Sequence, residues 1–349
     1  MMENELWKTE LKNCVYSYDE LKKKISLSET EQNATIEKNS FKFGISPHII
    51  ELINRYDTKG AIRKQFIPME NQKTFMFNED FLNEQTYTVA PNLVQRYPYK
   101  AILVVTEGCA AYCRFCTRAY RVGKNLSPSN LTQAFEYLQE HKEIYDIVIT
   151  GGDPLILDDF KLKEILSELQ KIKHIKIIRI NTRIPVTIPS RITDDLVQML
   201  SQISGLFINI HFEHPDEIDE KTKTACLKLA NAGIPLGSQS VLLKGINDDV
   251  ATLKELFFKL VQIKIKPYYL YQCDKTKGTE PFWLPPQKGI ELINILSPQL
   301  PGFAVPKFVV DVPGNIGKSC VAPYGIIGKN NNIYKFKNYY NNREYDYEI

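Results

Sequence analysis

Three of the chain's seven cysteines lie within eight residues of one another, in the stretch TEGCAAYCRFCTRAYRVGK at 106–124. Cys109, Cys113 and Cys116 follow the spacing C-x3-C-x2-C. A structural zinc site needs four ligands, usually in two separated pairs, so zinc here would require a fourth ligand from elsewhere in the chain. Three thiolates can instead hold an iron–sulfur cluster and leave one iron without a protein ligand. The spacing favours such a cluster, whose open iron can bind a substrate or cofactor and pass it an electron.

The cysteine loop directly follows the first of six short apolar runs rich in β-branched residues. These runs alternate with stretches whose apolar residues recur at helical spacing. Such alternation is typical of parallel strands covered by helices, so we expect an α/β fold with a partial or full (β/α)6-type barrel. A doubly wound open sheet is the alternative, although no GxGxxG turn follows the first run. The expected strands cover 101–108, 145–152, 175–183, 206–213, 237–243 and 268–274, and the expected helices cover 129–143, 158–172, 193–203, 219–233 and 248–262.

Three regions are expected along the chain. Residues 1–99 should be mainly helical, 100–300 should form the barrel, and 301–349 should hold a strand, the loop PGNIGK and an aromatic tail. In barrels the functional groups gather where strands end and loops begin. Polar residues recur at those points in this sequence: Thr106, Glu107, Gly151, Gly152, Asp153, Arg183, His211, Glu213, Gln239 and Asp274.

The composition narrows the class of protein. The chain has 349 residues, of which 43% are hydrophobic and 24% charged, as in ordinary globular proteins. A net charge of +3 lowers the expectation of nucleic-acid binding. No apolar run reaches the length of about 18 residues that a membrane span needs, and the start MMENELWKTELKN has no apolar segment of a secretory signal. With clustered thiols, this predicts a cytoplasmic protein without a membrane partner.

The cysteine loop and a glycine-rich segment together resemble the radical S-adenosylmethionine (SAM) superfamily. C-x3-C-x2-C follows the first barrel strand, and TGGDP follows the second. The resemblance implies a TIM-like partial barrel, a [4Fe-4S] cluster, SAM that is cleaved to methionine and a 5′-deoxyadenosyl radical, and an external one-electron reductant of flavodoxin or ferredoxin type. The implied cluster ligands are Cys109, Cys113 and Cys116, and the implied SAM contacts are Gly151, Gly152, Asp153, Arg183, His211 and Gln239.

A more specific resemblance, to the lysine 2,3-aminomutase family, extends over nearly the whole chain. It rests on AIRKQFIP, QRYPYKAILVVTEGCAAYCRFCTR, NTRIPVTIPSRIT, QSVLLKGIND, YYLYQCDKTKGTEPF and FVVDVPGNIGK. This family also carries pyridoxal phosphate, and the resemblance implies that Lys318 of PGNIGK binds the cofactor aldehyde. Arg96, Tyr97 and Lys100 are implied to bind its phosphate, with Lys100 where arginine is usual. A surface lysine and an exposed basic turn are the respective alternatives.

The same resemblance implies how an amino-acid substrate is held. Arg118 corresponds to the arginine that binds the substrate carboxylate, while Arg114 is a weaker candidate. Asp274 and Asp311 correspond to the two aspartates that bind a side-chain amine. Two neighbouring carboxylates repel each other unless a cation joins them, which favours lysine, leaves arginine open and argues against glutamate.

The sequence therefore predicts an isomerase that moves the α-amino group of a free basic L-amino acid to its β-carbon. Four alternatives stay open. They are an arginine 2,3-aminomutase, an enzyme that isomerises a lysine of a translation factor, an enzyme with the same cofactors that deaminates or decarboxylates, and a cluster-bearing binding protein without turnover.

The remaining cysteines carry expectations about assembly. Cys14, Cys226, Cys273 and Cys320 are scattered, and such cysteines are most often small buried side chains. No cysteine follows Cys320, and Asp249 stands where zinc-binding members of the family have a cysteine. We therefore expect no structural zinc, while a homodimer through the N-terminal helices or the aromatic tail stays open.

Overall fold

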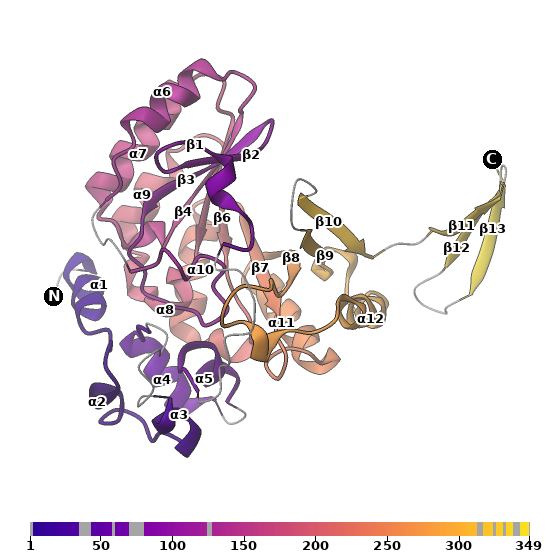
Figure 1. The fold of residues 1–349 in the computed structure, drawn as a ribbon, viewed down its shortest axis with the longest axis horizontal. Helices are drawn as coiled ribbons and strands as arrows, with labels where there is room; N and C mark the ends of the chain where they lie inside the picture. The colour runs from indigo at the N-terminus through magenta and orange to yellow at the C-terminus, as the bar shows by residue number, and fades with distance from the viewer. Residues whose placement is uncertain are drawn as a thin grey trace.

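One ten-stranded sheet forms the frame of the molecule, with its strands arranged in chain order from β1 to β10 (Figure 1). A computed structural model describes residues 3–34, 43–57, 60–69, 80–123, 128–312, 317–323, 326–330, 333–337 and 343–348. Strands β3 to β9 run parallel, whereas β1, β2 and β10 pair antiparallel at the two ends. Within these residues the first and last strands do not pair, so the barrel is open. The strands are β1 (Thr88–Ala90), β2 (Leu93–Tyr97), β3 (Lys100–Thr106), β4 (Asp146–Gly151), β5 (Ile177–Thr182), β6 (Leu206–Ile210), β7 (Leu236–Leu242), β8 (Lys266–Gln272), β9 (Lys307–Val312) and β10 (Gly317–Ala322).

The expected strand–helix alternation is confirmed, because the six predicted strands are β3 to β8 and the five predicted helices lie between them. These helices are α6 (Thr132–Glu140), α7 (Asp159–Lys171), α9 (Asp194–Ser201), α10 (Glu220–Asn231) and α11 (Val250–Gln262). Four of the five begin after a side chain that accepts a hydrogen bond from the backbone of the first turn. One of these caps is Asp249, whose Oδ1 lies 3.0 Å from the amide nitrogen of Thr252. Asp249, which the resemblance sets where zinc-binding members are expected to have a cysteine, therefore starts a helix here.

The sheet extends past both region boundaries expected from the sequence. Strands β1 and β2 precede residue 100, and β2 pairs with β3 through the short turn at 97–100. Strands β9 and β10 continue the sheet beyond residue 300. The N-terminal helices are α1 (Glu3–Lys12), α2 (Tyr18–Leu21), α3 (Glu29–Asn33), α4 (Pro47–Arg55) and α5 (Ala61–Phe66). Part of the aromatic tail forms a separate antiparallel sheet of β11 (Ile326–Asn330), β12 (Ile333–Lys337) and β13 (Glu344–Glu348).

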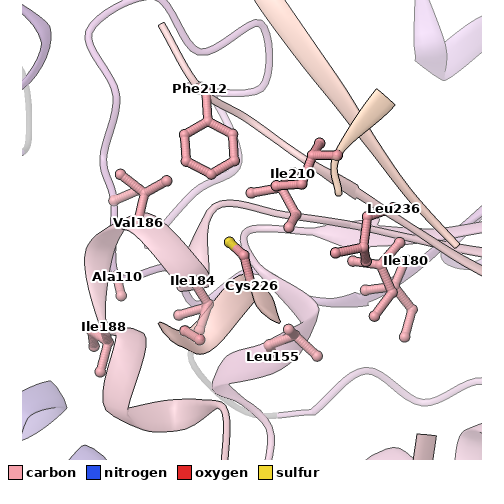
Figure 2. Close-up of a cluster of buried hydrophobic side chains, with 14 of the residues drawn as sticks. Ala110, Leu155, Ile180, Ile184, Val186, Ile188, Ile210, Phe212, Cys226 and Leu236 are labelled. Carbon is pink, nitrogen blue, oxygen red and sulfur yellow. The ribbon is translucent and has the colours of Figure 1, made fainter. Parts of the chain in front are cut away.

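An apolar core fills the space between the sheet and its helices. Figure 2 shows Ile180 of β5, Ile210 of β6 and Leu236 of β7 facing the same interior as Cys226 of α10. Cys226 has no solvent exposure, and Cys14 and Cys273 are also buried, whereas Cys320 is exposed. Two further helices are α8 (Ile184–Thr187) and α12 (Pro286–Leu296). In the part of the chain that the structure describes, no helix combines the length and apolar character that a membrane crossing requires.

Candidate active site

The loop after β3 brings the three predicted cluster cysteines to one cavity. Cys109, Cys113 and Cys116 line it together with residues 151–153 at the end of β4. Burial raises the pKa of the Cys116 thiol to about 11 and that of the other two thiols as well, so cations at the site would be needed to stabilise thiolates. Among the described residues no three acidic, histidine or cysteine side chains converge on a single ion. Three thiols that line one cavity suit a cluster, in which each thiolate binds its own iron.

The glycines at the end of β4 let two backbone segments approach closely beside the cysteines. The amide of Gly152 donates to the carbonyl of Thr106 at 2.8 Å, and that of Asp153 donates to the carbonyl of Gly108 at 2.8 Å. The Asp153 carboxylate is used inside the protein, because it accepts from the Thr182 hydroxyl at 2.7 Å and from the amide of Arg183 at 2.7 Å. Asp153 thus ties the end of β4 to the end of β5, and the glycine backbone is left to face the cavity.

Gly152→Ala should destabilise the protein even without cofactors. A Cβ at this position would lie 1.9 Å from the Gly108 carbonyl oxygen, so the backbone on one side has to move. We expect the free energy of unfolding to fall by about 1–3 kcal/mol, measured by urea denaturation of the iron-free protein. Gly302→Ala is the matched control, since no heavy atom lies within 4 Å of its added Cβ. Equal unfolding free energies for the two variants would contradict this account of the glycine segment.

A second cavity collects the residues predicted to bind pyridoxal phosphate. Arg96, Tyr97, Lys100 and Lys318 all line it. The antiparallel pairing of β9 and β10 sets Lys318 opposite Asp311, and the Lys318 ammonium donates to Asp311 Oδ2 at 2.5 Å. Arg96 Nη1 lies 3.6 Å from the other carboxylate oxygen of Asp311. Segments about 220 residues apart in the sequence therefore build one cationic corner.

Tyr97 joins this corner to the strand that carries Lys318. Its hydroxyl accepts a hydrogen bond from the backbone amide of Lys318 at 3.0 Å, and the Lys100 ammonium lies 4.1 Å from the centre of its ring. Asp274 lines the same cavity. Burial and the neighbouring Asp311 carboxylate raise the pKa of Asp274 to about 7, despite the opposing charges of Lys318 and Arg96. A further cation in the cavity would therefore stabilise the ionised form of Asp274.

Arg118 has a partner that the sequence analysis missed. The buried Glu84, in the short 3-10 helix Glu84–Tyr87, accepts from Arg118 Nε at 2.9 Å and from Nη2 at 2.5 Å. Tyr120 donates to the same carboxylate at 3.2 Å. Burial raises the pKa of Glu84, but the Arg118 charge outweighs this and holds it below its ordinary value. The opposite nitrogen, Nη1, lies 3.4 Å from the Thr150 hydroxyl, so Glu84 fixes which edge of the guanidinium is left for another ligand.

The two cavities adjoin one another. Their linings share seven residues: Phe115, Thr117, Arg118, Thr150, Asn181, His211 and Val241. Of the predicted SAM contacts, His211 lines both cavities, Gln239 lines the second, and Arg183 lines the first. Asn181 and Thr150 were not selected from the sequence, because nothing in their local pattern distinguishes them. A ligand in the cysteine cavity can therefore contact one in the Lys318 cavity.

Comparisons with known proteins show which proteins the chain resembles. The Radical SAM superfamily matches residues 103–257. The chain is 40% identical over 339 residues to L-lysine 2,3-aminomutase of Clostridium subterminale, covering 95% of this chain and 82% of that protein. It is 37% identical over 331 residues to glutamate 2,3-aminomutase of Clostridioides difficile, covering 93% and 78%. Among solved structures, Streptococcus suis SuiB bound to S-adenosylmethionine matches with a TM-score of 0.47 and 13% identity, over 66% of this chain and 54% of that one.

Proposed function

Because this chain belongs to the lysine 2,3-aminomutase family of the radical SAM superfamily, we propose that it moves the α-amino group of free L-lysine to the β-carbon with pyridoxal phosphate as second cofactor. The protein is a radical SAM aminomutase, an isomerase. The observation that carries the choice of substrate is the pair of aspartates, Asp274 and Asp311, in the cavity that also holds Lys318.

The residues present fit the cofactors. Cys109, Cys113 and Cys116 would hold the cluster, and the glycine backbone at 151–152 would face the amino-acid end of SAM. Together, a [4Fe-4S] cluster and SAM supply a carbon radical able to remove a hydrogen atom from an unactivated carbon, and pyridoxal phosphate supplies a ring over which an unpaired electron spreads. Because the two cavities share part of their lining, a hydrogen atom would have to move only a short distance between ligands bound in them.

The chain's own residues prepare the amine that would bind the aldehyde of pyridoxal phosphate. An amine must lose its proton before it can act as a nucleophile. Asp311 Oδ2, at 2.5 Å from Lys318 Nζ, holds that amine in the cavity. Arg96 and Lys100 supply positive charge for a phosphate in the same cavity. Glu84 holds Nε and Nη2 of the Arg118 guanidinium, and the remaining edge with Nη1 would bind the substrate carboxylate.

The two aspartates favour a substrate with a cationic side chain. Asp274 and Asp311 repel one another, and a bound ammonium relieves that repulsion. The distal carboxylate of glutamate would add a third negative charge at the same place. The glutamate-specific relative is nearly as similar in sequence as the lysine-specific ones, so the substrate has to be tested directly.

A competition experiment tests this proposal. The protein would be reconstituted without oxygen, given SAM, pyridoxal phosphate and dithionite, and offered equal amounts of lysine, arginine, ornithine and glutamate. We expect β-lysine to be the main product and to form at least about tenfold faster than β-glutamate, since one charge contact is worth about 1.4 kcal/mol or more. Preferential formation of β-glutamate or β-arginine, or no turnover of free lysine, would overturn the proposal.

The pH dependence of lysine turnover should report Asp274. Because burial and Asp311 raise the pKa of Asp274 to about 7, acidification below that value protonates the carboxylate and removes its attraction for the substrate ammonium. We expect kcat/KM for lysine to fall by up to about tenfold per pH unit below 7. Asp274→Asn should lower kcat/KM and abolish this acidic limb. An unchanged acidic limb in that variant would assign the titration to another group.

A further inference from the structure

A buried guanidinium points directly at one of the cluster cysteines. Arg183 follows β5, and its Nη1 donates to Cys113 Sγ at 2.8 Å. We infer that Arg183 raises the reduction potential of the cluster through this charged hydrogen bond, and that Gln65 and Glu217 are positioning residues that hold its guanidinium on the sulfur. The inference deepens the proposed function, because it rests on a cluster at the three cysteines.

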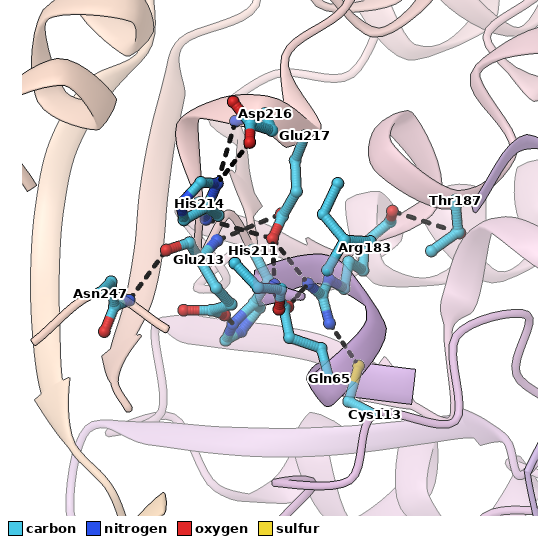
Figure 3. Close-up of polar contacts among 12 residues, drawn as sticks. Gln65, Cys113, Arg183, Thr187, His211, Glu213, His214, Asp216, Glu217 and Asn247 are labelled. Carbon is cyan, nitrogen blue, oxygen red and sulfur yellow. Dashed lines mark hydrogen bonds and ion pairs between the residues drawn. The ribbon is translucent and has the colours of Figure 1, made fainter. Parts of the chain in front are cut away.

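The other end of the guanidinium is anchored. Arg183 Nη2 donates to Gln65 Oε1 and lies 3.3 Å from Glu217 Oε1. Gln65 Nε2 donates to the same Glu217 oxygen at 2.7 Å. Figure 3 shows the guanidinium between Gln65 and Glu217 on one side and Cys113 on the other. With Nη2 held, Nη1 has a fixed direction toward the sulfur.

Glu217 is itself held by the backbone. Its two carboxylate oxygens accept from the amides of Glu213 and His214, each at 3.1 Å, in the turn after β6. The carboxylate therefore stays in place without Arg183. Because Glu217 is fully buried, its charge would be costly to leave unpaired. The Arg183 guanidinium is therefore strongly favoured at the position where it pairs with Glu217.

Aromatic rings cover the guanidinium. The Cζ atom of Arg183 lies 4.8 Å from the centre of the Phe66 ring and 5.3 Å from that of Phe115. Phe115 belongs to the cysteine loop, and Phe66 follows Gln65 on α5. These rings exclude water, and a charge acts more strongly on a neighbouring sulfur where the local dielectric constant is low. Arg183 is 4% exposed, so solvent does little to weaken its field.

Helix α5 is also joined to the cysteine loop through the backbone. The amide of Arg114 donates to the Gln65 carbonyl at 2.9 Å, and the Arg114 side chain donates to the Lys64 carbonyl at 2.7 Å. Gln65 thus contacts the loop by its main chain and Arg183 by its side chain. The N-terminal helical region in this way takes part in positioning the cluster environment, which the sequence analysis did not anticipate.

The effect on the cluster has a definite sign. One-electron reduction adds a negative charge to the cluster, and a nearby positive charge stabilises the reduced form. Hydrogen bonds to the ligand sulfurs are a recognised means by which proteins tune such potentials. Among the described residues, Cys113 alone of the three accepts a hydrogen bond from a charged side chain, whereas Cys109 Sγ accepts from the amide of Ala111 at 3.4 Å. Removal of Arg183 should therefore make the cluster harder to reduce.

A redox titration of the reconstituted protein, followed by electron paramagnetic resonance, tests the inference. In Arg183→Met we expect the ratio of reduced to oxidised cluster at a fixed potential to fall about tenfold, which is a shift of about 59 mV for one electron. Gln65→Met should shift the ratio in the same direction by a smaller factor, and Arg183→Lys, which keeps the charge, should lie between Arg183→Met and the parent. The control is Arg121→Met. Arg121 lies in the cysteine loop and pairs with Glu107, and its loss should change the ratio less than threefold.

The outcomes separate this inference from the proposed function. Arg183→Met with full iron content and the parent's potential would overturn the inference. If that variant fails to retain iron, Gln65→Met decides, because it keeps Arg183 and removes one of the two side chains that hold its guanidinium on the sulfur. A potential equal to the parent's in Gln65→Met would then overturn the inference, and a lowered one would support it. A parent protein that forms no cluster at all would instead refute the proposed function.

Discussion

Lys318→Ala should reduce aminomutase activity by at least about 10³-fold and leave iron content unchanged. Covalent attachment and alignment of a reacting group contribute effects of this size or larger. Lys318 lies in the second cavity, with its amine on Asp311, and it contributes nothing to the lining of the cysteine cavity. The variant should therefore separate the two cofactors.

Borohydride reduction followed by mass spectrometry gives the decisive readout for this variant. The parent protein, reduced with pyridoxal phosphate bound, should carry a pyridoxyl group on Lys318, and Lys318→Ala should carry none in this cavity. Lys307→Ala is the matched control, because Lys307 is an exposed residue of the paired strand β9 outside the cavity. A pyridoxyl group on a different lysine in the parent, together with retained activity in Lys318→Ala, would show that the wrong residue had been assigned.

Cys116→Ala should remove both the cluster and all measurable turnover. The chain offers three thiols on one loop, and a cluster with only two protein thiolates has lost a third of its protein ligands. We expect less than half of the parent's iron, no brown colour after anaerobic reconstitution, and no β-amino product. Iron analysis and visible absorption measure the first two directly.

The control for the cysteine variant is Cys320→Ala. Cys320 is exposed on β10 and lines neither cavity, so its loss should change iron content by less than about a tenth of the parent's value. A Cys116→Ala protein with the parent's iron and absorption would mean that the cluster is held by other ligands. The same readouts from Cys320→Ala as from Cys116→Ala would indicate general damage to the thiols.

The strand–helix pattern could be predicted because its signals are local. Each strand from β3 to β8 is a short apolar run, and each following helix has its own apolar stripe, mostly after a capping side chain. The cysteine loop could be predicted for the same reason, since all three thiols occur within eight residues. Residues such as Lys318 and Asp311 came from resemblance to a family, and the antiparallel register of β9 and β10 explains why two residues seven positions apart meet.

The contacts that hold the site together could not be predicted, because their partners are far apart in the sequence. Glu84 lies 34 residues from Arg118, and Gln65 lies 118 residues from Arg183. No local pattern marks either residue as a partner of a buried guanidinium. The edge strands β1 and β2 were missed for a related reason, since their short runs become strands by pairing with β3.

Isotope transfer tests the central claim, that a radical generated at the cysteine cavity reacts with an amino acid held in the Lys318 cavity. The reconstituted enzyme would be incubated with SAM and lysine deuterated at C3, and deuterium would be measured at the 5′ carbon of the adenosyl group. We predict that deuterium appears there and also in the β-lysine formed. Formation of β-lysine with no deuterium in the adenosyl group would contradict the claim, as would cleavage of SAM that leaves the lysine unchanged with all its deuterium at C3.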